Sequence, residues 1–273
     1  MKLLGVQLDI VWEDKAATFD RVRRLVDASR PEAGSLLVLP EMFSTGFSMN
    51  VAGIQEGSKR AAEQFMESLA KQWDIFVLGG VVNLGPDGRG RNQALAYSPQ
   101  GREIVRYDKI QPFSLGGEMK HYSPGDSIKQ FDWQQMRLAP FICYDLRFPE
   151  LFRDAVNAPP SGAPAQLLAV IASWPFPRDA HWTILLQARA IENQAYVIGV
   201  NRCGKDPHLT YPGRSMIIDP QGKILVDAGD TEKIIQADVD PAAVENWRRD
   251  FPALADRRAI SAAADTRPAP SEK

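Results

Sequence analysis

The sequence has few residues of the kinds that build metal sites and disulfide frameworks. Only two cysteines, Cys143 and Cys203, and three histidines occur in 273 residues. Two cysteines form at most one disulfide, and in a long chain without a secretion signal we expect both thiols to be free. The histidines show no HxxxH spacing and the cysteines no CxxC spacing, so a metal site has little support.

The chain also lacks an excess of charge and any long apolar run. Its 32 basic and 34 acidic residues provide no basic field that would collect nucleic-acid phosphates. No window approaches the roughly 18 apolar residues of a membrane-spanning helix. Gln7 and Asp9 interrupt the opening MKLLGVQLDIVW, which makes it a poor signal peptide. We therefore expect a cytoplasmic protein that acts on a small molecule, with no nucleic-acid or membrane partner.

The remaining composition, 44% hydrophobic and 24% charged, is that of a globular protein with a sizeable core. Short apolar runs such as KLLGVQLDI, SLLVLPE and IFVLGGVV alternate with helical patterns, and the first helix begins after Asp14. Apolar runs without strict alternation suit sheets that are covered on both faces. We expect an α/β fold with one domain over residues 1–260, in which helices flank two stacked sheets. Residues 261–273 have too little apolar content to pack, and we expect a mobile tail.

Three reactive side chains stand where predicted strands end. Glu41 ends SLLVLPE, Lys109 ends REIVRYDK and Cys143 ends MRLAPFIC. In helix-covered sheets, functional sites gather at strand ends and in the loops beyond them. Attack on a carbon centre needs a nucleophile, a base that ionises it and a positive group facing the oxyanion. A thiol, a carboxylate and an ammonium supply all three without a histidine.

Taken singly, these residues have plainer interpretations. Cysteine is among the most buried residue types, so Cys143 alone is more often a core residue. Glu41 alone is a solvated strand end, and Lys109 alone is a surface charge in a hairpin. Cys203 also ends a predicted strand but has no carboxylate or lysine motif of its own, so we expect it to be structural.

Taken together, the motifs resemble the nitrilase superfamily of carbon-nitrogen hydrolases. The resemblance covers nearly the whole chain, through VQLDI, LPEMF, YDKIQPF, CYDLRFPE, ARAIENQAYVIGVNR and GRSMIIDPQG. It implies Glu41 as general base, Lys109 as oxyanion stabiliser and Cys143 as nucleophile. It also implies a four-layer αββα sandwich, no metal or other cofactor, and a homodimer joined through the face that carries the helices near residues 150 and 185 and the end of the chain.

Further site residues are expected around these three. Glu118 in LGGEMKHYSPGD matches a second glutamate of the family, which orients the reacting groups, and the backbone N–H of Tyr144 is the second oxyanion donor. Phe43 and Phe113 follow catalytic motifs and Trp174 ends a predicted strand, so we expect these three to line the substrate pocket. Plain packing is the alternative for the two phenylalanines. For Arg147 and Glu150, binding of an anionic substrate is one interpretation, but for Arg147 we favour a structural ion pair that fixes the turn after Cys143.

The resemblance also narrows the function. CYDLRFP looks like the Nit-type amidases, and ASWPFPRDAHWTILLQARAIENQ is similar to omega-amidases, which cleave the terminal amide of 2-oxo acid amides such as 2-oxoglutaramate. We therefore expect a cysteine-dependent omega-amidase that releases ammonia through a thioester acyl-enzyme. The alternatives within this chemistry are a nitrilase, an N-carbamoyl amide hydrolase and a deaminated glutathione amidase. From other classes, the alternatives are a metal-dependent phosphoesterase with Glu41 as a ligand and a scaffold protein without activity.

Overall fold

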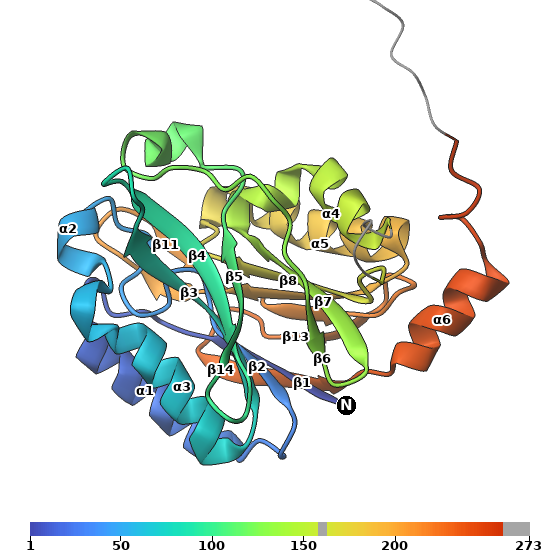
Figure 1. The fold of residues 1–273 in the computed structure, drawn as a ribbon, viewed down its shortest axis with the longest axis horizontal. Helices are drawn as coiled ribbons and strands as arrows, with labels where there is room; N and C mark the ends of the chain where they lie inside the picture. The colour runs from blue at the N-terminus through green and yellow to red at the C-terminus, as the bar shows by residue number, and fades with distance from the viewer. Residues whose placement is uncertain (158–162, 259–273) are drawn as a thin grey trace, which may run out of the picture.

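The computed structural model describes residues 1–157 and 163–258. Two six-stranded sheets stack against each other between two layers of helices (Figure 1). The predicted αββα sandwich is confirmed. The predicted C-terminal tail lies outside the described residues. None of the described helices is long and apolar enough to cross a bilayer.

The first sheet has the strand order β14-β1-β2-β3-β4-β5. Neighbours β1, β2 and β3 pair in parallel, and the outer strands pair antiparallel. Helices α1 and α3 cover its outer face (Figure 1). The bounds are β1 (Lys2–Gln7), β2 (Leu36–Val38), β3 (Phe76–Leu84), β4 (Gly90–Tyr97), β5 (Glu103–Asp108), β14 (Lys233–Asp238), α1 (Lys15–Ser29) and α3 (Ala61–Trp73).

The second sheet has the order β13-β12-β9-β8-β7-β6, with β7, β8 and β9 parallel. Helices α4 and α5 cover its outer face (Figure 1). The bounds are β6 (Phe131–Trp133), β7 (Met136–Ile142), β8 (Leu167–Ala172), β9 (Tyr196–Asn201), β12 (Met216–Ile218), β13 (Ile224–Asp227), α4 (Pro149–Val156) and α5 (Asp179–Asn193). The remaining described strands form the ribbon β10 (Cys203–Lys205) and β11 (Thr210–Pro212), and the remaining α-helices are α2 (Val51–Ile54) and α6 (Pro241–Asp250). Five short 3₁₀ helices, η1 to η5, complete the described elements.

Local sequence signals explain where the helices begin. The side chain of Asp14 accepts a 2.9 Å hydrogen bond from the backbone N–H of Ala17 and caps α1. Thr18, Val22 and Val26 then recur every four residues and are buried against the first sheet. Helix α4 begins at Pro149, whose ring fixes a helical φ and whose missing N–H is not needed in the first turn.

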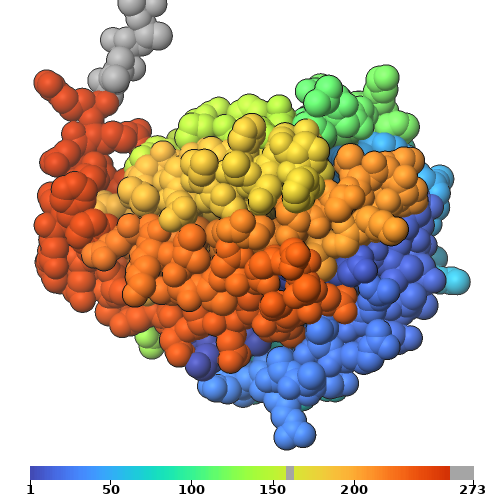
Figure 2. Space-filling model, turned by 180° about the vertical axis from the view of Figure 1, so that it is seen from behind, coloured from blue at the N-terminus to red at the C-terminus, as the bar shows by residue number. Residues whose placement is uncertain are grey.

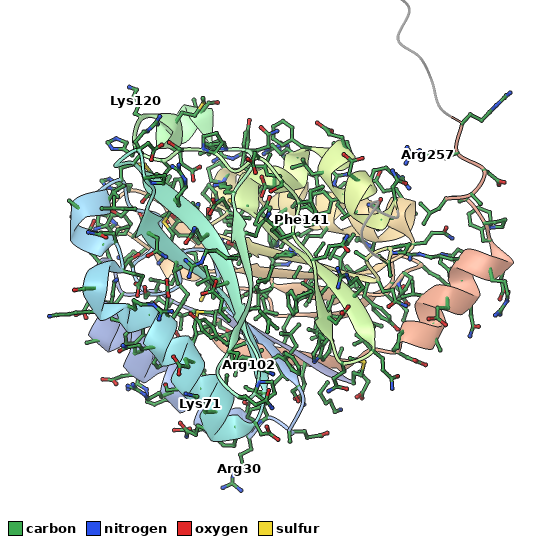
Figure 3. All side chains as sticks on the ribbon, in the orientation of Figure 1. Arg30, Lys71, Arg102, Lys120, Phe141 and Arg257 are labelled. Carbon is green, nitrogen blue, oxygen red and sulfur yellow. The ribbon has the colours of Figure 1, made fainter. Side chains whose placement is uncertain are left out.

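The largest core cluster joins residues of both sheets with residues of α4 and α5. Phe141 of β7 belongs to it and is fully buried, and its ring stacks on Phe152 of α4 at 4.0 Å between centroids. Burial of such a side chain stabilises the fold by roughly 1.5–3 kcal/mol. Figure 3 places Phe141 in the interior, while the charged side chains of Arg30, Lys71 and Lys120 extend outward. This packed interior supports the strand ends on which the site is built.

Candidate active site

One cavity of about 520 Å³ opens where β2, β5, β7 and β8 end. Glu41, Lys109 and Cys143 all line it, although they come from distant parts of the chain. Lys109 follows directly after β5, Cys143 follows directly after β7, and Glu41 stands three residues beyond β2. The structure therefore brings together the three side chains that the sequence predicted at strand ends.

Cys143 stands at a sharp change of backbone direction. Ile142 is extended, and Cys143 has a φ of 48°, in the left-handed region that few non-glycine residues adopt. A short 3₁₀ helix, η4 (Cys143–Arg147), begins there. The turn takes the thiol out of the strand and leaves it partly accessible from the cavity, whereas its neighbour Ile142 is fully buried. Left-handed backbone at a non-glycine residue costs of order 1–3 kcal/mol and persists only where the surroundings enforce it.

Asp145 enforces this turn. Its Oδ2 accepts hydrogen bonds from the backbone N–H of Ile142 at 2.9 Å and from the hydroxyl of Tyr107 at 2.7 Å. Its Oδ1 accepts a 2.8 Å bond from the backbone N–H of Gln111, in the loop after Lys109. Burial raises the pKa of Asp145 to about 6, against the opposing effect of these donors. One carboxylate thus ties the cysteine turn to the strand end that carries Lys109.

Lys109 joins two buried carboxylates. Its Nζ lies 3.0 Å from Oε1 of Glu41 and 2.8 Å from Oε2 of Glu118, and all three side chains are at most 2% exposed. The backbone N–H of Phe113 donates to the same Oε2 of Glu118 at 2.6 Å. Burial alone would favour the neutral amine, but Glu118 and Glu41 outweigh it and hold the pKa of Lys109 above its ordinary value. Lys109 is therefore an ammonium at neutral pH.

The sequence did not indicate two donors to this cluster. Nδ2 of Asn92, on β4, donates to Oε1 of Glu41 at 2.7 Å and to Oε1 of Glu118 at 2.9 Å. The backbone N–H of Ser173, just after β8, donates to Oε2 of Glu41 at 2.8 Å. The second bond joins the two sheets, because Glu41 follows a strand of the first and Ser173 a strand of the second. The one feature of the sequence that could have indicated Asn92 is that a polar residue stands at an inward-facing position of a strand.

The thiol of Cys143 is held in its neutral form. Burial and the negative charge of Glu41 raise its pKa well above the ordinary value, and Lys109 opposes this shift without cancelling it. A neutral thiol requires a base that removes its proton during attack, and Glu41 lines the same cavity. The arrangement favours base-assisted attack by Cys143 over a permanent thiolate.

Aromatic and cationic side chains form the walls of the cavity. Phe113 and Trp174 line it, as expected from the sequence. Tyr144 also lines it, and its backbone N–H directly follows the nucleophile. Arg147 lies 4.7 Å from the Trp174 ring, and Arg178 lies 5.3 Å from the Phe113 ring. Both arginines line the cavity. No feature of the sequence had indicated Arg178 as a residue of the site.

The expected structural ion pair of Arg147 is wrong for the described residues. None of the ion pairs among residues 1–157 and 163–258 includes Arg147 or Arg178. The guanidinium of Arg147 instead lies 3.2 Å from the exposed His181 ring and over Trp174. Asp145 fixes the turn in its place, through backbone N–H groups. Arg147 is thus a cation that faces the cavity without a carboxylate partner in the described chain.

The prediction that Phe43 lines the pocket is also wrong. Its backbone N–H donates to Gly80 of β3 at 3.1 Å, and its fully buried ring faces the helices that cover the first sheet. There it packs against Phe19 and Phe65, with 6.0 Å between ring centroids in each pair. The alternative of plain packing holds for Phe43.

Cys203 is buried in the β10–β11 ribbon outside the cavity, and both cysteines are free.

In the part of the chain that the structure describes, no group of three His, Cys, Asp or Glu side chains is arranged to hold a metal ion.

The model of the family described as "Carbon-nitrogen hydrolase" matches residues 5–249. The chain is 36% identical over 262 residues to "Omega-amidase YafV" of Yersinia enterocolitica, covering 94% of this chain and 96% of that protein. It is 30% identical over 254 residues to "2-oxoglutaramate amidase" of Bacillus subtilis, covering 93% and 96%. Among solved structures it resembles XC1258 of Xanthomonas campestris, a CN-hydrolase superfamily protein with an arsenic adduct in its active site. That match has a TM-score of 0.87 and 30% identity, and it covers 96% of this chain and 99% of the other.

Proposed function

The chain belongs to the carbon-nitrogen hydrolase family, and on that premise we propose that it is a cysteine-dependent omega-amidase. Its substrates are small 2-oxo acid omega-amides of the 2-oxoglutaramate type, which it converts to the acid and ammonia. The observation that carries the proposal is a cavity in which Cys143 and Lys109 share the space with Arg147 and Arg178. The names of the Yersinia and Bacillus relatives support the same substrate class.

The two arginines explain why the substrate carries a carboxylate. A guanidinium presents a planar set of N–H donors that matches a carboxylate, and such charge-assisted bonds are stronger than neutral ones. Because neither arginine forms an ion pair with a described residue, both are available to a ligand. A terminal amide at Cys143 and an anionic group at Arg147 and Arg178 then share one cavity. Phe113 and Trp174, which these arginines overlie, supply the apolar wall for the carbon chain.

The first half of the proposed reaction forms a thioester. Glu41 takes the proton of the Cys143 thiol as the sulfur attacks the amide carbonyl carbon, and the carbonyl electron pair moves onto oxygen. The Lys109 ammonium and the backbone N–H of Tyr144 hold that oxyanion. When the C–N bond breaks, Glu41 returns the proton to the leaving nitrogen and ammonia departs. Glu118 keeps Lys109 in place through the 2.8 Å ion pair.

The second half hydrolyses the thioester. Glu41 removes a proton from water, the resulting hydroxide attacks the acyl carbon, and the same two donors hold the second oxyanion. The C–S bond then breaks, the carboxylic acid leaves, and the proton on Glu41 returns to sulfur. Glu41 therefore carries every proton that is transferred in the two halves of the reaction.

A substrate panel tests the proposal. Ammonia release is measured with 2-oxoglutaramate, an aliphatic nitrile, an N-carbamoyl amino acid and deaminated glutathione at equal concentrations. We expect the highest kcat/KM with 2-oxoglutaramate and none with Cys143→Ala. Release from another member of the panel, with none from the 2-oxo amide, would refute the omega-amidase branch and leave the family assignment intact. The metal-dependent phosphoesterase reading has no support from the matched family.

The expected homodimer stays a proposal. Ile184 and Ile191 of α5 are 62% and 55% exposed, and Figure 2 shows this helix on the surface next to the β12–β13 hairpin. Exposed apolar side chains on one helix face mark an interaction surface. We expect a dimer by light scattering and a monomer for the double variant Ile184→Glu/Ile191→Glu.

A single domain over residues 1–260 also stays a prediction, which limited proteolysis tests. A cytoplasmic location stays a prediction as well, which cell fractionation tests.

A further inference from the structure

Asn92 lies at the centre of the buried polar cluster, yet no step of the proposed reaction uses it. It is 2% exposed, and both N–H bonds of its amide end on carboxylates, at 2.7 Å from Glu41 and 2.9 Å from Glu118. We infer that Asn92 is a positioning residue that keeps Glu41 and Glu118 ionised side by side, so that Glu41 can accept the thiol proton. The inference rests on the proposed role of Glu41 and deepens it.

The charges around Asn92 show why a neutral donor is needed. Among the described residues, one ammonium, Lys109, faces two carboxylates, and the other titratable groups near them are the thiol of Cys143 and the phenols of Tyr122 and Tyr211. Two carboxylates that share one cation repel each other, and repulsion of this kind favours protonation of one of them. A protonated Glu41 would not accept a proton from Cys143. An amide that donates to both carboxylates stabilises their charged forms without a further charge in the site.

The orientation of the amide has a cost that packing alone does not explain. Oδ1 of Asn92 is buried and accepts no hydrogen bond from a described residue. The reverse orientation would place this oxygen against two carboxylate oxygens, so the carboxylates dictate that Nδ2 faces them. A buried acceptor without a donor is unfavourable, and an apolar side chain of the same size would avoid the penalty. The retained amide therefore points to a role in donating to Glu41 and Glu118.

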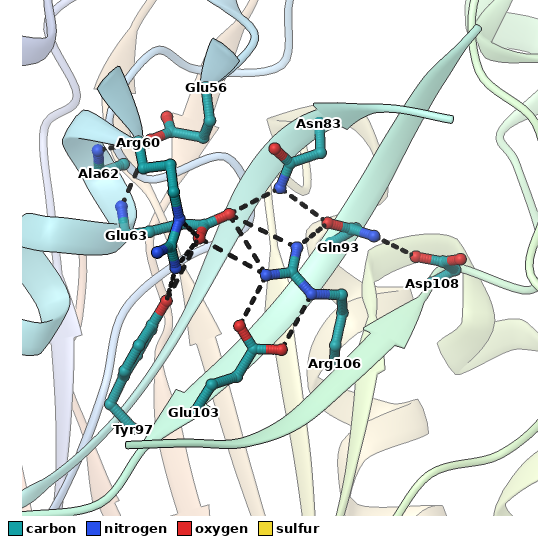
Figure 4. Close-up of polar contacts among 10 residues, drawn as sticks. All are labelled: Glu56, Arg60, Ala62, Glu63, Asn83, Gln93, Tyr97, Glu103, Arg106 and Asp108. Atoms are coloured by element: carbon teal, nitrogen blue, oxygen red, sulfur yellow. Dashed lines mark hydrogen bonds and ion pairs between the residues drawn. The ribbon is translucent and has the colours of Figure 1, made fainter. Parts of the chain in front are cut away.

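The backbone holds Asn92 in register with Lys109. The carbonyl oxygen of Asn92 accepts a 2.9 Å hydrogen bond from the backbone N–H of Lys109, across the β4–β5 pair. Because successive side chains of a strand point to opposite faces, Gln93 faces the other way. Figure 4 shows it in a separate polar cluster, where its Oε1 accepts from Arg106 at 2.7 Å and its Nε2 donates to Asp108 at 2.6 Å. Gln93 is therefore a matched control that shares the strand but not the site.

The test compares Asn92→Leu and Asn92→Asp with Gln93→Leu. The readout is the rate at which iodoacetamide modifies Cys143, followed by peptide mass from pH 4 to pH 8, together with the pH profile of kcat/KM for any amide turned over. In Asn92→Leu we expect the acidic limb of both profiles to move to higher pH by about one unit, because the carboxylates lose their shared donor. In Asn92→Asp the added carboxylate should move it further. At the optimum, we expect kcat to fall about 10- to 100-fold because Glu41 is less well placed.

Gln93→Leu should lower the melting temperature and leave the acidic limb where it is in the wild type. Asn92→Ser, which is smaller and keeps one donor, is included so that a folded variant is available, and its limb should lie between those of wild type and Asn92→Leu. Unchanged limbs in all Asn92 variants, with only a lower melting temperature, would overturn the inference. Modification by iodoacetamide needs no substrate. A wild type that hydrolyses no omega-amide would therefore refute the proposed function and leave this inference to be decided by the limb shift.

Discussion

The Nζ of Lys109 lies 3.0 Å from Oε1 of Glu41, although 68 residues separate them in the chain. Glu41 follows the central strand β2 and Lys109 follows the edge strand β5 of the same sheet. Glu118 binds the same ammonium from the short 3₁₀ helix η3 (Glu118–Lys120). This buried triad of one cation and two carboxylates fixes the side of the cavity that faces Cys143, and its charge balance leads to the first prediction.

Lys109→Met should abolish activity and destabilise the fold. Removal of an oxyanion donor costs about 10²- to 10³-fold in kcat. It also leaves two buried carboxylates without their cation, and breaking a buried ion pair in this way costs about 3–5 kcal/mol. Adding Glu118→Gln removes one uncompensated charge, so the double variant should be more stable than Lys109→Met and equally inactive. Denaturant unfolding and ammonia release measure the two effects. Recovery of activity in the double variant would contradict the role of Lys109.

The Cys143 thiol should be neutral at pH 7 in the free protein. Burial and the negative charge of Glu41 raise its pKa well above the ordinary value of a thiol. The ultraviolet absorbance of a thiolate, taken as the difference between wild type and Cys143→Ala, should be absent at pH 7 and should grow only above pH 9. Cys203 does not interfere, because burial raises its pKa to about 12. A thiolate signal that depends on Cys143 at pH 7 would favour a preformed ion pair over base-assisted attack.

Arg147→Met and Arg178→Met should each weaken selection for an anionic amide. Loss of a hydrogen bond to a charged group costs about 1.5–3 kcal/mol, which corresponds to about 10- to 100-fold in kcat/KM for 2-oxoglutaramate or succinamate. The change should appear mainly in KM, and kcat/KM for the neutral butyramide should not fall. Arg102→Met is the control, because Arg102 is exposed and precedes β5, whereas the cavity lies where β5 ends. Equal losses for anionic and neutral amides would show that the arginines support the fold instead.

The pH dependence of stability should report on Asp145. Burial raises its pKa to about 6 in the folded state, against about 3.9 in an unfolded chain. The folded protein thus holds this proton more tightly, and the resulting stabilisation is present below about pH 4 and is lost as the pH rises through about 6. Relative to Asp145→Asn, which cannot titrate, the wild type should gain about 1 kcal/mol of unfolding free energy between pH 7 and pH 5. A difference between the two proteins that does not change with pH would exclude the raised pKa.

The positions of Glu41, Lys109 and Cys143 could be predicted because each ends an apolar run. Such runs must be strands covered by helices, and the ends of neighbouring strands meet at one edge of the fold. The loop that carries Glu118 has no such regularity, so its position came from the family resemblance. Asn92 is a polar residue within strand β4, whose other inward-facing side chains belong to the core. Only the pairing of β4 with β5 shows that the Asn92 side chain reaches two carboxylates.

The two errors have a common physical cause. Phe43 and Arg147 were assigned from their distance along the chain to Glu41 and Cys143, but a turn of the backbone decides which way each side chain points. The chain reaches Phe43 through Met42, which has a φ of 44°, and the pairing with Gly80 turns the phenyl ring toward α1 and α3. Asp145, not Arg147, closes the turn after the nucleophile because its carboxylate reaches two backbone N–H groups.

The most direct test of the account is detection of the acyl-enzyme on Cys143. The wild-type protein is mixed with saturating 2-oxoglutaramate, quenched in acid within one turnover, digested and mapped by mass spectrometry, with ammonia measured in the same samples. The account predicts a hydroxylamine-labile acyl group on the peptide that contains Cys143, with one ammonia released per acyl group, and neither in Cys143→Ala. Ammonia release at the wild-type rate by Cys143→Ala, with no acyl group on the wild-type peptide, would contradict it.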